Sequence, residues 1–358
     1  MQGVIQMKLS DRNWGIFLIG DLFSVKRPPA RNKDDYEVGD IPFVASGSVN
    51  NGVMKCCKPL ENEKLDEAGC ITVSPVDGSA FYQPYSFLGR GGAGSSILML
   101  YADNLNLYSG QFIAKMIANT CACKYKYGHM GNKDGIKRER IMLPVDENNN
   151  PDYQFMEDYV KELMEKKRQQ YLAYCKEQLK FIGGGYDLIP LKDKEWKSFF
   201  IVDIFDNIQR GKRLKTADHL SGKVPYVSSS ALNNGVDNFV SNEKGVRLFS
   251  NCISLANSGS VGSSFYEPFE FVASDHITHL KNDEFNKYHY LFLATMTSRL
   301  SQKYNFNREI NDKRISREII LLPVNDQGDP DYDYMEKYSK NTFREKMQNY
   351  IDYIGDFN

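Results

Sequence analysis

Apolar residues follow two different spacings along the chain, and the two spacings alternate twice. Roughly over 8–150 and 196–329, short apolar runs are separated by turn signals, which is typical of strands. Over 152–182 and 331–354, apolar and aromatic residues recur three or four positions apart, which predicts helices. We therefore expect an α+β fold in which a strand-rich mixed segment and a long helix follow each other twice.

The strand-rich segments divide into shorter elements. The clearest strand-like runs lie at 71–73, 81–82, 97–100, 253–255 and 265–266. Short helices are expected at about 109–119 and 286–303, whereas 25–34 and 209–221 read as loops.

No glycine or proline interrupts the two long helical segments. Asp152 and Asp331 stand where an acid favours a helix start, because it faces the positive end of the helix dipole. Gly183-Gly184-Gly185 ends the first helix, since glycine readily takes the backbone angles of a helix terminus. At about 1.5 Å per residue, this helix would be about 45 Å long.

A helix of that length needs a long partner for its apolar stripe, and the other long helix is the nearest candidate. If a pseudo-twofold axis relates the two copies, the helices pack antiparallel and the mixed domains lie at opposite ends. In the alternative, each helix folds back on its own mixed domain. The stripes consist of Met156, Val160, Leu163, Tyr171, Tyr174 and Phe181, and of Met335, Tyr338, Phe343, Met347, Tyr350 and Ile354.

The repetition extends to individual residues. Trp14 and Trp196 open the two copies, and Asp203 follows Asp21 by 182 residues. Near the end of each copy, Leu143-Pro144-Val145 matches Leu322-Pro323-Val324. Such self-similarity indicates a duplicated unit. We assign 1–150 to a first mixed domain, 151–185 to a helix and glycine linker, 186–329 to a second mixed domain, and 330–358 to a second helix.

Composition places the chain among ordinary globular proteins. Of its 358 residues, 41% are hydrophobic and 25% charged, which is enough to build sizeable cores. No apolar run approaches the length of a membrane span, and the first residues lack the pattern of a secretory signal. A cytoplasmic location and no membrane partner are expected.

The cysteines and histidines give weak signals. Seven cysteines, an odd number without paired zinc spacing, fit reduced packing residues. His276 and His279 lie three positions apart, and because such a His-x-x-His pair alone is usually structural, they are interpreted as structural. We therefore expect no metal site. The net charge of −1 leaves room for clustered basic residues balanced by acids elsewhere.

The order of the motifs, repeated twice, is the specific feature of this chain. Each copy has a tryptophan, Asp-[Leu/Ile]-Phe, a basic loop, [Ile/Val]-Pro-[Phe/Tyr]-Val, and Leu-Pro-Val before the helix. This order resembles the specificity subunit of type I restriction–modification systems. The loop Gln209-Arg210-Gly211-Lys212-Arg213 is the most family-like stretch. The Pro-Asp-Tyr run at 151–157 and 330–336 looks closer still to specificity subunits of type IIB-like systems.

The resemblance implies two target recognition domains separated by two long antiparallel helices. It also implies a chain that does not catalyse, that recognises a bipartite target in double-stranded DNA, and that recruits methyltransferase subunits or fused nuclease–methyltransferase subunits. No cofactor is expected in this chain. S-adenosylmethionine and Mg²⁺ are expected in the partner subunits. The first copy departs from the family at Lys26-Arg27-Pro28-Pro29-Ala30-Arg31, where the basic glycine loop would be.

A DNA reader needs cations for phosphates and donor–acceptor side chains for base edges. Basic loops and basic, aromatic windows before each helix supply both in each copy, although a solvated surface loop is the plain alternative. The candidate contacts in the first copy are Lys26, Arg27, Arg31, Lys33, Lys124, Lys126, Tyr127, His129 and Lys133. Those in the second copy are Arg210, Lys212, Arg213, Lys215, Tyr304, Asn307, Arg308, Lys313 and Arg314.

Two polar turns are secondary candidates. Ser46-Gly47-Ser48 with Asn50-Asn51, and Ser228-Ser229-Ser230 with Asn233-Asn234, contain donors and acceptors for bases. They could equally be hairpin turns, because Asn-Gly is a strong turn signal.

Catalytic motifs are missing from the sequence. The glycine-rich run from Gly89 to Gly94 lacks the lysine and hydroxyl residue of a phosphate-binding loop. No Asn-Pro-Pro-aromatic or Asp-Pro-Pro-aromatic tetrapeptide of an amino-methyltransferase occurs. Asp152 with Glu165-Lys166-Lys167 mimics a nuclease pattern, but it lies along a predicted helix and is assigned to helix capping.

Three other functions remain open at this stage. A scaffold, host-interaction or inhibitor protein could copy the two-headed shape without reading sequence. A self-contained nuclease could use the acids and lysines of 151–167. A carbohydrate-binding protein is prompted by the many tyrosines and by Trp14 and Trp196, although we interpret these tryptophans as core or hinge anchors.

Overall fold

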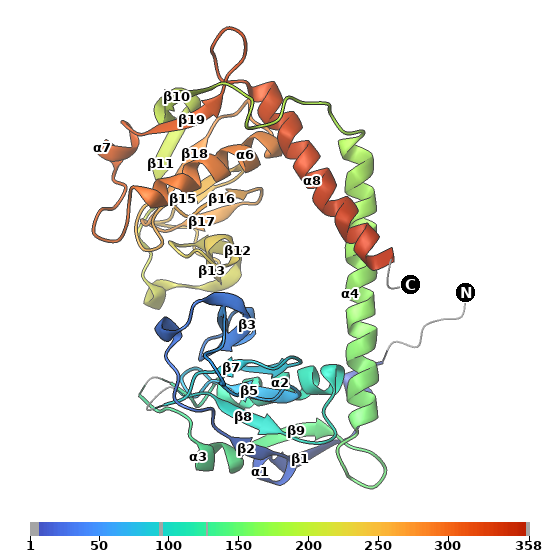
Figure 1. The fold of residues 1–358 in the computed structure, drawn as a ribbon. Helices are drawn as coiled ribbons and strands as arrows, with labels where there is room; N and C mark the ends of the chain where they lie inside the picture. Colours follow the sequence, from blue (N-terminus) through green and yellow to red (C-terminus); the bar gives the residue numbers. More distant parts are fainter. Residues whose placement is uncertain (1–6, 93–95, 127, 356–358) are drawn as a thin grey trace. The chain divides into compact units, whose positions relative to one another are not determined.

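The computed structural model describes residues 7–92, 96–126 and 128–355 (Figure 1). The chain divides into two compact units, residues 1–171 and 172–358. Each unit combines mainly antiparallel sheets with helices, as expected for an α+β fold. Corresponding elements follow one another in the same order in both units, with one additional short strand in the second, which confirms the tandem repeat.

The first unit is built on a four-stranded sheet of order β2-β8-β5-β6 and a three-stranded sheet of order β4-β3-β7. A separate pair, β1 and β9, joins the two ends of the mixed domain. The strands are β1 (Trp14–Leu18), β2 (Ser24–Lys26), β3 (Val38–Val44), β4 (Val53–Cys57), β5 (Cys70–Val73), β6 (Ala80–Gln83), β7 (Leu88–Gly89), β8 (Leu98–Tyr101) and β9 (Arg140–Pro144). The helices are α1 (Ile19–Leu22), α2 (Leu107–Cys121), α3 (Lys133–Lys137) and the long α4 (Tyr153–Ile182), which continues into the second unit.

The second unit repeats this plan with sheets of order β11-β18-β15-β16 and β13-β12-β17-β14, and with the pair β10 and β19. Its strands are β10 (Trp196–Phe200), β11 (Asn207–Arg210), β12 (Ser221–Val227), β13 (Val236–Val240), β14 (Leu248–Phe249), β15 (Cys252–Ala256), β16 (Ser264–Glu267), β17 (Phe271–Ala273), β18 (Ile277–Lys281) and β19 (Ile319–Pro323). Its helices are α5 (Ile201–Ile204), α6 (Lys287–Ser298), α7 (Asp312–Ile315) and α8 (Tyr332–Gly355). Short 3₁₀ helices occur in both units: η1 (Leu9–Asp11), η2 (Lys33–Asp35), η3 (Asn50–Gly52), η4 (Thr216–Asp218), η5 (Asn233–Gly235) and η6 (Arg299–Gln302).

One helix covers the four-stranded sheet in each unit. In the first unit, Ile113 and Ile117 of α2 pack with Ile71 and Leu100 of the sheet in one buried cluster. In the second, α6 takes the same place beside β15 and β16. An asparagine caps each of these helices, because the side chains of Asn106 and Asn286 accept hydrogen bonds from the first turn. The helices expected at 109–119 and 286–303 are therefore confirmed, the second with its last turn as η6.

The two tryptophans hold equivalent places against the two cores. Trp14 Nε1 donates to Leu9 O at 3.1 Å, and its ring stacks on Phe112 at 6.3 Å between centroids. Trp196 Nε1 donates to Leu191 O at 3.3 Å and stacks on Phe292 at 6.3 Å. Both rings are partly buried and pack against the core of their own unit, as expected for core anchors.

The long helices begin and end where the sequence predicts. Asp152 Oδ1 accepts from Phe155 N at 2.9 Å, and Asp331 Oδ1 accepts from Tyr334 N at 3.0 Å. Both aspartates therefore cap a helix, as expected for Asp152 from its place before the first turn. Gly183 ends α4 with a φ of +77°, which is a conformation that favours glycine.

Both expectations for the helix stripes prove partly right. The first turns of each helix pack on their own domain, through Met156 and Val160 for α4 and through Met335 for α8. Within the second unit, the end of α4 packs against α8 through Cys175, Ile182 and Met347.

The segment that follows α4 runs antiparallel to α8. Gly183 O accepts a hydrogen bond from Arg344, and Tyr186 N donates to Asn341 Oδ1 at 2.9 Å. As the chain advances from 183 to 186, its partner residue on α8 therefore moves back from 344 to 341.

Two segments expected to be loops contain regular structure. β2 overlaps the start of 25–34 and β11 overlaps the start of 209–221, and both are edge strands paired with the inner strands β8 and β18. Each of these short strands has a single apolar residue, Val25 in β2 and Ile208 in β11, so neither contains an apolar run that would mark it in the sequence. All five strand-like runs named above are strands.

The remaining general expectations concern cysteines and membranes. None of the seven cysteines forms a disulfide, and five of them are buried. In the described part of the chain, no helix is both long enough and apolar enough to span a bilayer.

Candidate nucleic-acid interface

The basic loop after β11 is anchored to the ends of two strands. Gly211 N donates to Ile277 O at 2.8 Å, and Lys212 N donates to Ala273 O at 3.0 Å. The backbone of the loop is thereby fixed, while the side chains of Lys212, Arg213 and Lys215 remain exposed. This arrangement presents cations to solvent from a rigid support.

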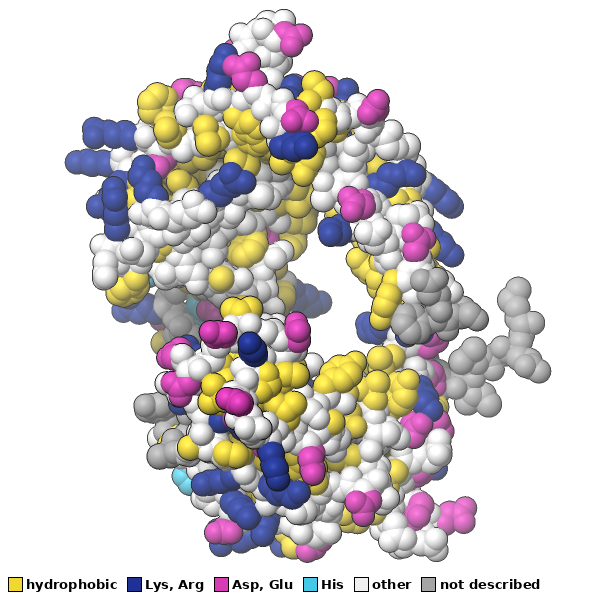
Figure 2. Space-filling model, viewed as in Figure 1, with side chains coloured by type: hydrophobic (Ala, Val, Ile, Leu, Met, Phe, Trp, Pro, Cys, Tyr) yellow, Lys and Arg dark blue, Asp and Glu magenta, His cyan; other side chains and the backbone are white. Residues whose placement is uncertain are grey.

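The basic window before α8 lies beside this loop. The Arg210 guanidinium Nε lies 3.5 Å from Asp312 Oδ1 at the start of α7. Ile310 N donates to Asn257 O at 2.9 Å, which fixes the window against the end of β15. The structure therefore brings together the two segments of the second copy, and Figure 2 shows Lys and Arg side chains gathered over α7.

Some exposed basic side chains of these two segments have partners within the described part of the protein, and others have none. Arg308 lies with its guanidinium carbon 5.3 Å from the Tyr304 ring centroid, and Arg314 donates to Glu309 O. Among the described residues, no ion pair holds Lys212, Arg213, Lys215 or Lys313. Asn307 is exposed in the turn between them. Cations free of acids are suited to phosphate contacts.

The polar turn of the second unit lies beside the basic loop after β11 and the basic window before α8. We call these three segments together the basic edge of the second unit. Ser260 N donates to Ser229 O at 3.0 Å, which ties the turn to the loop after β15. Asn233 and Asn234 have φ of +51° and +53° and exposed side chains. The hairpin-turn interpretation is thus confirmed, and it still leaves these amides available to a ligand.

The first unit has an equivalent edge. Gly131 N donates to Pro75 O at 2.8 Å, and Ser79 Oγ donates to Gly47 O at 2.9 Å, so the window before α4 and the polar turn meet the loop after β5. β2, which leads into the basic loop, contacts α3 at the end of the window. Lysine and arginine side chains also gather near α3 in Figure 2.

The predicted residues of the first unit differ in exposure. Arg27, Lys33, Lys126, His129 and Lys133 are exposed. Lys124 is exposed but forms an ion pair with Glu139. Lys26 lies 3.7 Å from Glu67 and 4.6 Å from the Tyr101 ring centroid. Tyr127 lies outside the described residues.

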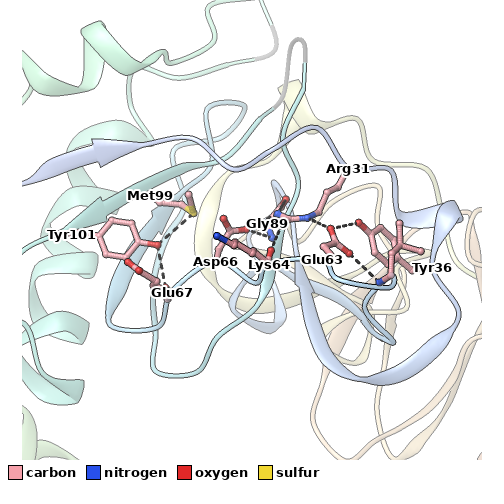
Figure 3. A network of polar contacts seen from close by, with 10 residues as sticks. Arg31, Tyr36, Glu63, Lys64, Asp66, Glu67, Gly89, Met99 and Tyr101 are labelled. Atoms are coloured by element: carbon pink, nitrogen blue, oxygen red, sulfur yellow. Dashed lines mark hydrogen bonds and ion pairs between the residues drawn. The ribbon is translucent and has the colours of Figure 1, made fainter.

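The prediction that Arg31 contacts DNA is wrong. Its side chain is only 2% exposed and forms ion pairs and hydrogen bonds inside the domain (Figure 3). It lies 2.6 Å from both Glu63 Oε1 and Asp66 Oδ2, and it donates to Gly89 O at 3.0 Å. Tyr36 completes the network by donating to Glu63 at 2.8 Å. Because Arg31 is buried and paired with two carboxylates, it cannot reach a phosphate. Its role is to stabilise the fold of the domain.

The protonation of this network follows from its contacts. Burial opposes the charge on Arg31, but the hydrogen bond to Glu63 and the charge of Asp66 raise the Arg31 pKa above its ordinary value. Burial also opposes the charge of Glu63, yet the bonds from Arg31 and Tyr36 hold the pKa of Glu63 below its usual range. Burial, together with the bond to Glu63, raises the pKa of Tyr36 to about 12.

The prediction that Tyr304 contacts DNA is also wrong. Its ring is 3% exposed and its hydroxyl donates to Glu318, which also accepts from Lys303 Nζ at 2.8 Å. Burial and the Glu318 bond raise the pKa of Tyr304 to about 12. The Tyr304 ring packs against the Arg308 guanidinium and is itself too buried to contact DNA. Arg210, 34% exposed, is likewise a link between segments more than a free cation.

Sequence reasoning missed several residues of this edge. Asn257 bonds Ile310 through its backbone, His276 is exposed in the turn between β17 and β18, and Arg247 donates to Arg210 O. These residues lie at strand ends far apart in sequence, so only the sheet order reveals that they meet. No signal in the local sequence identifies them.

The described residues contain no cluster of three or more His, Cys, Asp or Glu side chains able to hold a metal ion. Asp152, which prompted a nuclease hypothesis, caps α4 and lies 3.6 Å from Arg12. The chemistry that the exposed edges support is binding of an anionic polymer.

The sequence of this chain is similar to those of known proteins. The family model of the type I restriction modification DNA specificity domain matches residues 11–184 and again 193–352. The specificity subunit S.BcgI of a type II restriction enzyme from Heyndrickxia coagulans is 29% identical over 332 residues, which cover 91% of this chain and 93% of that protein.

Two solved structures are also similar in architecture. The S subunit of a type I restriction–modification system from M. genitalium has 16% identity and a TM-score of 0.45, and the match covers 98% of this chain and 95% of that one. The HsdS subunit from Thermoanaerobacter tengcongensis has 13% identity and a TM-score of 0.31, with 96% and 91% covered. Since the family model matches both halves of the sequence, this chain belongs to the family of type I restriction–modification DNA specificity domains.

Proposed function

We propose that this chain is the DNA-specificity subunit of a restriction–modification complex and that each unit reads one half of a bipartite target. The observation that carries the proposal is the repetition of one exposed basic edge, built from equivalent loops, in both units. A protein that recognises DNA with two copies of one domain needs the same binding surface in each copy. Loops without a shared function would not be expected to keep equivalent anchoring contacts in both units.

The residues of each edge divide into two chemical classes. Lysines such as Lys212, Lys215 and Lys133 suit phosphates, which position the protein without carrying sequence information. Arg213, Arg308 and Asn307 suit base edges, because arginine matches guanine and asparagine matches adenine in the major groove. The two half-sites should lie about one helical turn apart, as rigid twofold-like readers require.

Catalysis is assigned to partner subunits. Methyltransferase subunits, or fused nuclease–methyltransferase subunits, would bind S-adenosylmethionine and Mg²⁺ and dock on the stripe of the long helices and its flanks. Exposed apolar residues on α4, including Leu163 and Phe181, support this surface. A cavity of about 420 Å³ between α6 and α8, lined by Trp196, Leu291 and Phe343, adds an apolar recess beside it.

The experiment that tests the proposal is sequencing of methylated sites in DNA from cells that express the complex. We expect one interrupted motif with two specified halves. A non-reading scaffold predicts that methylation shows no motif that depends on this chain, and that duplex binding shows no sequence preference at any salt concentration.

A further inference from the structure

One polar position distinguishes the two units just behind the polar turns. Gln83 at the end of β6 pairs with Cys70 of β5, and Glu267 at the end of β16 pairs with Cys252 of β15. The two residues therefore occupy the same place in the repeated sheet, with an amide in one unit and a carboxyl group in the other.

In the first unit, the amide holds the polar turn. Gln83 Nε2 donates to Asn51 O at 3.0 Å and to Thr72 Oγ1 at 2.9 Å, and the side chain is 5% exposed. The backbone of Asn51, whose φ is +53°, is thereby tied to the sheet. The turn is one of the elements that form the exposed edge.

In the second unit, the corresponding carboxyl group is incompletely bonded. Glu267 is 0% exposed, and its Oε1 accepts from Ser254 Oγ at 2.9 Å. Its Oε2 is buried without a hydrogen-bond partner among the described residues. β16, which ends at Glu267, packs against η5, just as β6, which ends at Gln83, packs against η3.

Among the described residues, no cation forms an ion pair with Glu267. Cys252, directly opposite on β15, has its thiol pKa raised to about 12 by burial. His279, beside Ser254 on β18, has its pKa lowered by burial, and Lys281 at the edge is paired with Asp283 at 2.9 Å. Asp237, which follows η5, is exposed. An uncompensated buried carboxylate is costly, and burial raises the pKa of Glu267 to about 7.

We infer that Glu267 is a positioning residue of the second unit, whose neutral carboxylic acid donates to the Asn234 carbonyl and holds that turn as the Gln83 amide holds the turn at Asn51. Loss of the proton removes the donor and leaves a carboxylate facing a carbonyl oxygen. The turn of the second unit is therefore sensitive to pH, whereas that of the first is not. The consequence for DNA reading rests on the proposed function; the positioning itself does not.

Reciprocal substitutions, Glu267→Gln and Gln83→Glu, test the inference in the full chain. Hydrogen exchange of Gly235 N, which donates to Leu232 O at 2.8 Å, reports on the turn without DNA, after correction for the intrinsic exchange rate. In the unsubstituted chain, protection should fall as pH rises through about 7. Protection should be independent of pH in E267Q, and Q83E should transfer the dependence to Gly52 N. An unsubstituted chain without the transition, or an E267Q chain that keeps it, would overturn the inference.

A second measurement separates this inference from the proposed function. In the assembled complex, selectivity for the second half-site should fall about fivefold across the same pH range, the ratio that corresponds to one hydrogen bond. Selectivity for the first half-site should not change. If the turn titrates and E267Q abolishes the titration, but selectivity stays constant, the positioning role is supported and reading by this turn is contradicted. E267Q introduces the residue type of the other unit, so it keeps the test valid even if Q83E does not fold.

Discussion

Arg210 and Asp312 connect the basic loop after β11 to the start of α7, with 3.5 Å between the guanidinium Nε and Oδ1. Asp312 is 78% exposed, so the pair contributes little stability. Its effect is to orient two segments that are about a hundred residues apart in sequence. We expect Asp312→Asn to change the free energy of unfolding by less than about 1 kcal/mol.

The same substitution should lower selectivity for the second half-site, measured by competition between duplexes that differ only there. Asp326→Asn is the matched control, because Asp326 is an exposed aspartate in the turn after β19. Equal effects of the two substitutions would contradict an orienting role for Asp312.

Lys212 and Arg213 test the phosphate and base contacts of the second unit. Lys212→Ala with Arg213→Ala should weaken duplex binding and reduce the slope of log affinity against log salt by about 0.9 for each lost phosphate contact. Lys192→Ala with Lys197→Ala removes the same charge near the start of β10, and it should leave the slope unchanged. A similar loss in both double variants would mean that only net charge matters.

Arg31 and Arg27 separate a structural cation from an exposed one. Arg31→Ala leaves Glu63 and Asp66 without their buried partner, so we expect it to destabilise the first unit by about 3–5 kcal/mol in chemical denaturation. Arg27→Ala should leave stability unchanged and weaken DNA binding. Full stability of the Arg31→Ala chain would show that the network is not needed for folding.

Asp152 distinguishes helix capping from nuclease chemistry. Asp152→Ala should cost about 1 kcal/mol of stability through loss of the cap, and Asp331→Ala should cost a similar amount. DNA cleavage by the assembled complex should be unchanged. A selective loss of cleavage in the Asp152→Ala chain, with stability and binding intact, would favour a catalytic carboxylate.

Glu267 should also make stability depend on pH. Its folded pKa of about 7 exceeds the ordinary 4.5, so the folded state binds more protons between these values. Stability is therefore greatest below about pH 4.5 with respect to this group, and it falls by roughly 3 kcal/mol as pH rises through about 7. The difference in unfolding free energy between the unsubstituted chain and E267Q should change with pH in this sense, and a constant difference would contradict it.

The sequence predicts the long helices well because their signals are local. Asp152, Gly183 and the three-and-four spacing lie within the segments that they define. The inner strands were equally recognisable from short apolar runs. The edge strands β2 and β11 were not, since pairing with β8 and β18 supplies what their own sequence lacks.

The candidate contacts were predictable as regions and not as individual side chains. Arg31 and Arg27 look alike in sequence, and only the fold brings Glu63 and Asp66 to Arg31. Tyr304 was selected for its aromatic ring, but Glu318 binds its hydroxyl inside the domain. Which member of a basic cluster faces outward depends on partners more than ten residues away.

The most direct test of modular reading replaces residues 1–150 with another domain of the same family and sequences the methylated sites made by the resulting complex. Because each unit carries its own basic edge, we predict that one half-site changes while the other half-site stays the same. A change in both half-sites, or in neither, would contradict the account.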